Sequence, residues 1–146
     1  MASSRPAARW VGALLVVQLA GLIVPFALLH PMIPPGFLDS AAASTVQVKV
    51  AVVLLFLNCA LTIGITAILW PVLWRSSETA AVLLLAGSVI MFSLQAVDNA
   101  HLLSMLSLSQ QYVNDSSRGE LLQAMGATVR STRRWVHYSE LFSIEI

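Results

Sequence analysis

The chain has 146 residues, of which 58% are hydrophobic and only 10% are charged, whereas soluble domains have about 25% charged residues. Such a composition excludes an ordinary water-soluble domain, because a folded chain in water needs far more charged surface to stay dispersed. The formal net charge of +1 gives no basis for nucleic-acid binding. Cys59 is the only cysteine, so a disulfide framework and a thiolate metal site are also excluded.

The first predicted membrane helix covers residues 10–29, an uncharged run preceded by Arg5 and Arg9. Its length matches the ~20 residues that cross the hydrocarbon core. A cleaved signal peptide is the alternative, but its apolar part would be only about 7–15 residues long. The one small-residue site, Ala41-Ala42-Ala43, lies far beyond this run. The pattern therefore favours an uncleaved membrane anchor.

The second predicted helix covers residues 46–73 and follows a connecting loop. Three prolines and a glycine between His30 and Ala43 predict that this connection contains no regular helix. Ser44 and Gln47 fit a capping box at the helix start. Pro71 is expected to end or kink the helix.

One face of the second helix is predicted to pack against other helices. Asn58, Thr62 and Thr66 recur at intervals of four residues, and a small-residue step lies beside them. Polar side chains bond across membrane helices, and small residues let backbones approach closely. The predicted helix-packing residues are Asn58, Ala60, Thr62, Gly64 and Thr66.

The third predicted helix covers residues 78–108, with Ser77 as its N-cap and Glu78 complementing its dipole. It is longer than a bilayer requires, so it must tilt or project beyond the lipid. A further helix over residues 117–138 is amphipathic, with Arg130, Arg133 and Arg134 largely off its apolar face. This pattern, with Trp135, is typical of a helix lying along a membrane surface.

The predicted fold is therefore all-α: one membrane domain over residues 1–146, with three transmembrane helices and a C-terminal amphipathic helix. The positive-inside rule gives a divided answer on which side of the membrane the N-terminus lies. The first helix favours a cytoplasmic N-terminus, and the arginine cluster argues for the opposite. The basic residues on the two sides are Arg5, Arg9 and Arg75, against Lys49, Arg118, Arg130, Arg133 and Arg134.

Three short stretches are similar to those of a known family. They are Trp70-Pro71-Val72-Leu73, the run from Leu106 to Val113, and Arg133-Arg134-Trp135. Their order and spacing resemble an uncharacterised family of bacterial polytopic membrane proteins, the domain-of-unknown-function family numbered four-three-eight-six. The resemblance implies a bundle of about six membrane helices, of which this chain would end after the third. It implies no activity and no catalytic residues.

The candidate site is a polar cluster in the third helix, formed by Gln95, Asp98, Asn99 and His101. Asp98 and His101 are three residues apart and can touch. An ionisable residue in a membrane segment suggests a proton relay or a contact to a small substrate. Two alternatives remain: the cluster lies at the headgroup boundary in water, or it bonds to Asn58 or Thr62.

No recognisable order of nucleophile and base occurs, and neither a catalytic residue nor a cofactor is predicted. The sequence favours a non-enzymatic membrane protein, either an accessory subunit or a permease-like bundle. The alternative is a membrane-embedded hydrolase or metal-dependent enzyme that uses the Asp98/His101 region, with His137 and Glu140 as further ligands. The expected partners are the lipid bilayer and a second copy or another membrane subunit; the expected location is the cell membrane.

Overall fold

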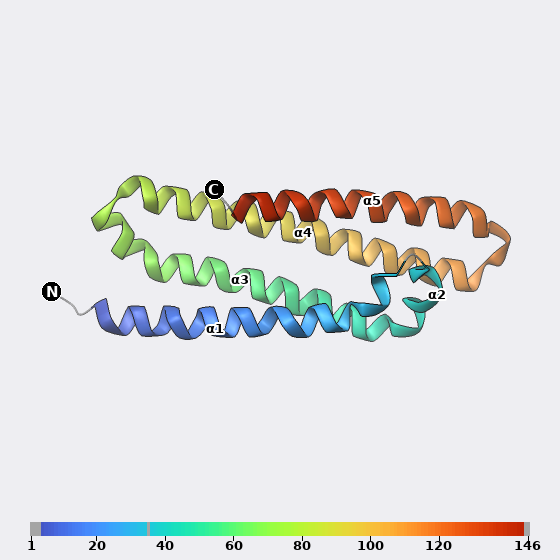
Figure 1. Ribbon diagram of the computed structural model, residues 1–146, viewed down its shortest axis with the longest axis horizontal. Helices are drawn as coiled ribbons and strands as arrows, with labels where there is room; N and C mark the ends of the chain where they lie inside the picture. Colours follow the sequence, from blue (N-terminus) through green and yellow to red (C-terminus); the bar gives the residue numbers. More distant parts are fainter. Residues whose placement is uncertain (1–3, 35, 145–146) are drawn as a thin grey trace.

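In the computed structural model, which describes residues 4–34 and 36–144, four long helices form an elongated bundle (Figure 1). They are α1 (Ser4–Leu28), α3 (Thr45–Ser76), α4 (Glu78–Asn114) and α5 (Gly119–Ile144). The described residues contain no strand, which confirms the all-α prediction.

Three of these helices are long and apolar enough to cross a membrane, as the sequence predicted. Their apolar segments are Arg9–Leu28, Ala42–Ser76 and Glu78–Asn114. Both later helices extend beyond the predicted ends. α3 continues past Pro71 to Ser76, since a proline close to a helix end disturbs few backbone bonds.

The two predicted helix starts have different outcomes. Ser77 caps α4, with its hydroxyl accepting a hydrogen bond from the Ala80 amide at 3.3 Å, and Glu78 lies in the first turn. Ser44 precedes α3, but its side chain makes no capping bond. The Gln47 amide instead donates to the Leu28 carbonyl at 2.9 Å, tying α3 to the end of α1. The predicted capping box is therefore wrong, because a tertiary contact takes one of its members.

The connection between α1 and α3 is built from short helical turns where the sequence predicted no regular helix. These are η1 (His30–Met32), α2 (Phe37–Ser40) and η2 (Ala42–Ser44). The hydroxyl of Ser109 in α4 holds this connection: it donates to the Leu38 carbonyl at 2.7 Å and accepts from the Ala42 amide at 2.8 Å. The main hydrophobic core lies here, with Met32 and Phe37 buried against Leu102 and Met105.

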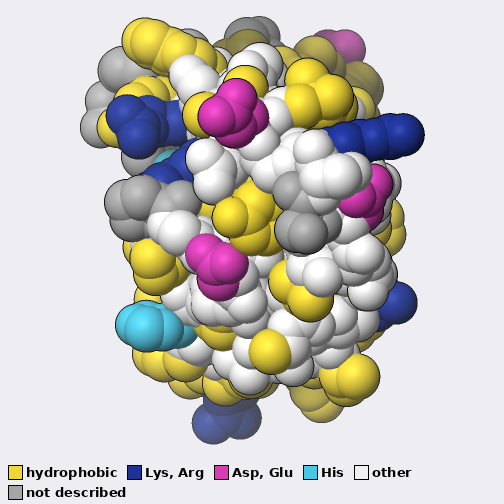
Figure 2. All heavy atoms as spheres, turned by 90° about the vertical axis from the view of Figure 1, so that its right-hand side faces the viewer, with side chains coloured by type: hydrophobic (Ala, Val, Ile, Leu, Met, Phe, Trp, Pro, Cys, Tyr) yellow, Lys and Arg dark blue, Asp and Glu magenta, His cyan; other side chains and the backbone are white. Residues whose placement is uncertain are grey.

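The amphipathic helix α5 runs antiparallel along α4 (Figure 1). A membrane-surface helix would lie across the ends of the spanning helices. α5 instead lies along them, so the predicted surface orientation is wrong. Gly126 lets α5 also approach α2 closely, because a Cβ there would lie 3.3 Å from Phe37 Cζ. The end of the bundle that carries α2 presents charged side chains of both signs among hydrophobic ones (Figure 2).

Candidate functional site

A buried ion pair joins α4 to α5 at the predicted polar cluster. Arg133 Nε donates to Asp98 Oδ1 at 2.9 Å, and Nη2 donates to Oδ2 at 3.2 Å. The Asp98 side chain is only 4% exposed, and that of Arg133 is 23% exposed. A guanidinium presents its donors in a fork that matches both carboxylate oxygens, which gives this pair its geometry.

The pair changes the interpretation of Asp98. The sequence suggested contact with water, with His101, or with Asn58 and Thr62; in the structure both oxygens accept from Arg133. His101 lies at the edge of the cluster, with Nδ1 2.8 Å from the Val97 carbonyl of its own helix. The spacing of three residues predicted that His101 could touch Asp98. In the structure, Arg133 of α5 binds the carboxylate instead.

The other two predicted residues face α3. Gln95 Nε2 donates to Asn99 Oδ1 at 3.1 Å, and Asn99 Nδ2 donates to the Val52 carbonyl at 3.5 Å. Both side chains are buried. The structure thus brings Gln95, Asp98 and Asn99 into the interior of the bundle and leaves His101 partly exposed.

A cavity of about 280 Å³ adjoins the ion pair, enclosed by α1, α3, α4 and α5. Its apolar wall includes Leu22, Phe26 and Leu55. Its polar lining comes from all four helices: Gln18, Asn58, Thr62, Gln95, Asp98, Arg133 and His137. This mixture of an apolar wall and a few convergent polar groups is typical of small-molecule sites.

Asn58 is the one polar group of this lining with an unsatisfied buried atom. Its Oδ1 has no hydrogen-bond partner among the described residues. Glycine at position 21 makes room for it, since a Cβ there would lie 2.8 Å from that oxygen. Beside it, Gln18 Nε2 donates to Thr62 Oγ1 at 2.6 Å. An orphaned acceptor in an apolar medium costs about 1–3 kcal/mol unless a ligand or water satisfies it.

The predicted packing face of α3 divides into two groups. Asn58 and Thr62 line the cavity, and the Thr66 hydroxyl bonds to that of Ser88 in α4 at 2.6 Å. Ala60 and Gly64 are exposed, and a Cβ at Gly64 would meet nothing within 4 Å. The small-residue step therefore faces outward from this chain.

The sequence did not indicate two polar residues of the cavity, Gln18 and Arg133, and it indicated His137 only as a possible metal ligand. Gln18 is the one strongly polar side chain of the first apolar run, which is a usable signal. Arg133 and His137 are four residues apart and share a face of α5. That face could be matched to Asp98 only after the direction of α5 was known.

The described residues offer no group of three or more His, Cys, Asp or Glu side chains that could hold a metal ion. Asp98 and His137 both line the cavity, but Arg133 occupies the carboxylate oxygens. The side chain of Glu140, the remaining candidate ligand from the sequence, lies outside the described residues.

Comparison with known protein families identifies one that this chain matches over most of its length. The model of a family described as a domain of unknown function, DUF4386, matches residues 10–143. The chain belongs to the DUF4386 family. No curated protein and no solved structure matches it. Membership of DUF4386 agrees with the resemblance seen in the sequence and supplies no activity.

Proposed function

We propose that this DUF4386 protein is a non-enzymatic, permease-like bundle that holds a small polar molecule in the cavity beside the Asp98–Arg133 pair. One observation carries the proposal: Asn58 lines a cavity among the apolar spans, and its buried Oδ1 has no hydrogen-bond partner among the described residues. Polar groups within membrane segments are costly, and they commonly mark the path or binding site of a substrate.

The charges of the lining define the class of molecule. Asp98 and Arg133 neutralise each other, so the cavity offers neither sign of charge in excess from this pair. The solute is therefore uncharged or zwitterionic. It carries a hydrogen-bond donor for Asn58 Oδ1 and an apolar side that lies against Leu22 and Leu55.

Thermal unfolding of the purified protein tests this proposal. A panel of small polyols, amides and zwitterionic amino acids is added in neutral detergent, and compounds that raise Tm are tested for uptake into reconstituted vesicles. Asn58→Leu is expected to abolish both effects, whereas Asn114→Leu, the same substitution at an exposed position of α4, leaves them intact. Uptake equal to that of protein-free vesicles for every compound would contradict the permease-like role.

The enzymatic alternative has weaker support from the geometry. Both Asp98 oxygens accept from Arg133, so that carboxylate is not free to take a proton from a nucleophile.

A role as an accessory subunit has its own supporting observation. Only 6% of the apolar segment of α1 is buried, and Ala60 and Gly64 of α3 face outward. A second copy or another membrane subunit would cover part of this surface. Gly64→Leu is expected to reduce self-association in mild detergent, measured by light scattering. Gly87→Leu is the control on α4, since Gly87 also has open space around it. A monomeric wild-type protein would contradict self-association.

We further propose a cell-membrane location with a cytoplasmic N-terminus, which the charges flanking the first helix support. In a Cys59→Ala background, Asn114→Cys at the α2 end is expected to react with an impermeant thiol reagent in intact cells. Ser76→Cys at the opposite end is expected to be protected. The reverse pattern would show the opposite orientation.

A further inference from the structure

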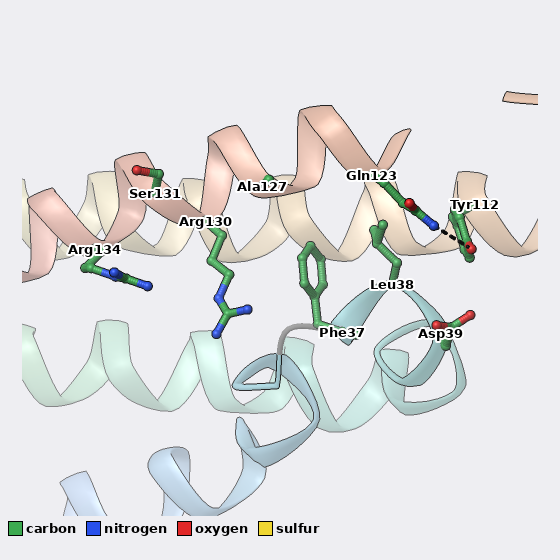
Figure 3. Close-up of a pocket in the computed structure, with 10 residues that line it drawn as sticks. Phe37, Leu38, Asp39, Tyr112, Gln123, Ala127, Arg130, Ser131 and Arg134 are labelled. Carbon is green, nitrogen blue, oxygen red and sulfur yellow. Dashed lines mark hydrogen bonds between the residues drawn. The ribbon is translucent and has the colours of Figure 1, made fainter. Parts of the chain in front are cut away.

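A second cavity, of about 550 Å³, lies between α5 and the connection that joins α1 to α3. Two arginines of α5, Arg130 and Arg134, line it from the same side of the helix (Figure 3). Both guanidinium groups are directed into the space between α5 and this connection, and that of Arg134 points toward Arg130 (Figure 3). This cavity is separate from the one beside Asn58.

These two arginines lack the carboxylate partner that Arg133 and Arg118 have. Arg133 is paired with Asp98, and Arg118 lies 3.7 Å from Asp115. Arg130 donates from Nη2 to the Ile33 carbonyl at 2.8 Å, and Arg134 is exposed. Neither makes an ion pair with a carboxylate of the described side chains.

One acidic residue also lines the cavity, but it lies away from the arginines. Asp39 is at the end where the Gln123 amide donates to the Tyr112 hydroxyl at 3.1 Å, and Arg134 is at the other end (Figure 3). The charge of the cavity is therefore divided, with its positive part on the side that faces the end of α1.

The depth of this positive part matches that of lipid phosphates. The apolar segment of α1 ends at Leu28, and Arg130 bonds to Ile33 shortly beyond it. An arginine at this level lies where the hydrocarbon gives way to headgroups. Trp135 is 68% exposed and packs edge-to-face on Tyr138, as expected of side chains at a membrane interface.

An apolar depression continues from the arginines toward the membrane interior. It has a volume of about 340 Å³ and shares Arg130 and Arg134 with the 550 Å³ cavity. Phe26, Leu29 and Ile33 form its apolar wall, and Phe26 and Ile33 are 50% and 57% exposed. Its lining also includes Arg133, which is paired with Asp98, and His137 and Tyr138. A site with two cations at headgroup depth and an apolar wall below them fits an amphiphile with an anionic head.

We propose that Arg130 and Arg134 bind the phosphate of an anionic phospholipid, with an acyl chain lying along the depression below them. Guanidinium groups bind phosphate oxygens through two parallel N–H bonds, and basic pockets between membrane helices are known to take anionic headgroups. The lipid would join α5 to the end of α1, which no ion pair of the described residues does.

Thermal unfolding and native mass spectrometry of the full chain in neutral detergent test the proposal. Added phosphatidylglycerol is expected to raise Tm and remain bound, and phosphatidylcholine and inorganic phosphate are expected to do neither. Arg134→Gln is expected to weaken phosphatidylglycerol binding about tenfold, the loss of one charged contact of about 1.4 kcal/mol. Arg130→Gln,Arg134→Gln is expected to abolish it.

Arg118→Gln is the matched control, because it removes the same charge in the turn that precedes α5 and is expected to leave binding unchanged. Arg134 is exposed, so its substitution tests the site without threatening the fold. Equal stabilisation by phosphatidylcholine, or unchanged binding in the double variant, would overturn the proposal. Equal stabilisation by inorganic phosphate would also overturn it and indicate a site for the free anion.

Discussion

The two ends of the bundle are held together by different forces. At the α2 end, apolar side chains from α2, α3, α4 and α5 form one buried core, and Met32, Leu102 and Met105 are at most 1% exposed. At the opposite end, helices α1, α3 and α4 run side by side with few buried residues. There the Thr66–Ser88 and Gln18–Thr62 bonds make the main polar contacts.

This difference is the one that water around the α2 end and lipid around the opposite end would produce. Water drives apolar side chains together, so a segment outside the lipid needs a buried core. Lipid tails are as apolar as leucine, so spanning helices gain little by hiding such side chains from them. The exposed apolar residues of α1 and α4 are accordingly no defect in a membrane protein, although they would be in a soluble one.

The largest expected effect is at the junction of the two ends, where Asp98 and Arg133 join α4 to α5. Arg133→Leu leaves the Asp98 carboxylate buried without its partner, and should lower the free energy of unfolding by about 3–5 kcal/mol. Arg134→Leu, one residue away and exposed, should change it little. Unfolding in mixed detergent micelles measures both.

The double variant Asp98→Leu,Arg133→Leu removes both charges together. It should recover most of the stability lost in Arg133→Leu, because no buried charge remains unpaired. If the single Arg133→Leu variant were as stable as wild type, the pair would not join the two ends.

The second prediction compares the two ends by making the same change, leucine to alanine, at each end of α4. Leu102→Ala removes a fully buried side chain from the core at the α2 end and should cost about 2–5 kcal/mol. Leu83→Ala, where the side chain is 66% exposed, should cost less than about 0.5 kcal/mol. Equal losses in lipid vesicles would show that both ends rely on packing to the same degree.

A smaller effect is expected for the hydrogen bond between Thr66 and Ser88. Thr66→Val keeps the shape of the side chain and removes the hydroxyl. A bond of this kind between membrane helices contributes about 0.6 kcal/mol and at most about 1.7 kcal/mol. A double-mutant cycle with Ser88→Ala isolates the coupling, and a value near that of a buried ion pair would contradict this account of the spanning end.

The smallest effect concerns Asp115, in the turn between α4 and α5. The side-chain hydrogen bond from Ser117, then its backbone amide and the nearby Arg118, hold the pKa of Asp115 below its ordinary value. A lowered folded-state pKa gives stability that is present above the unfolded pKa and is lost as pH falls through the folded one. Asp115→Asn should therefore lower Tm at neutral pH, and the difference should vanish in strong acid. A difference that grew on acidification would contradict this.

Several parts of the candidate site were readable in the sequence, and others were not. Gln95, Asp98 and Asn99 were found because polar residues are rare and costly in an apolar run. Arg133 could not be assigned to Asp98, because their pairing depends on α5 turning back along α4. The same turn changed the expected orientation of the amphipathic helix, whose pattern fits a lipid surface and a helix face equally well.

The buried connection between α1 and α3 was missed for a related reason. Prolines at 31 and 34 and glycine at 36 predicted no regular helix there, but the connection contains the four-residue helix α2 between two short turns. They gave no sign that Phe37 and Leu38 would be buried, since burial depends on Ser109 and Gly126 arriving from α4 and α5. Local propensity predicts the backbone conformation of a segment. It does not predict burial, because the residues that bury the segment lie far along the chain.

The sequence by itself determined the all-α class, the three apolar spans and the family, since hydrophobic run length and short motifs are local properties of the chain. Only the tertiary structure decided that α5 joins the bundle and that Asp98 pairs with Arg133. It also decided that Asn58, whose Oδ1 has no hydrogen-bond partner among the described residues, lines a cavity. These features arise where side chains from different helices meet at one depth. The direction and register of the helices set that depth, and no single segment encodes either.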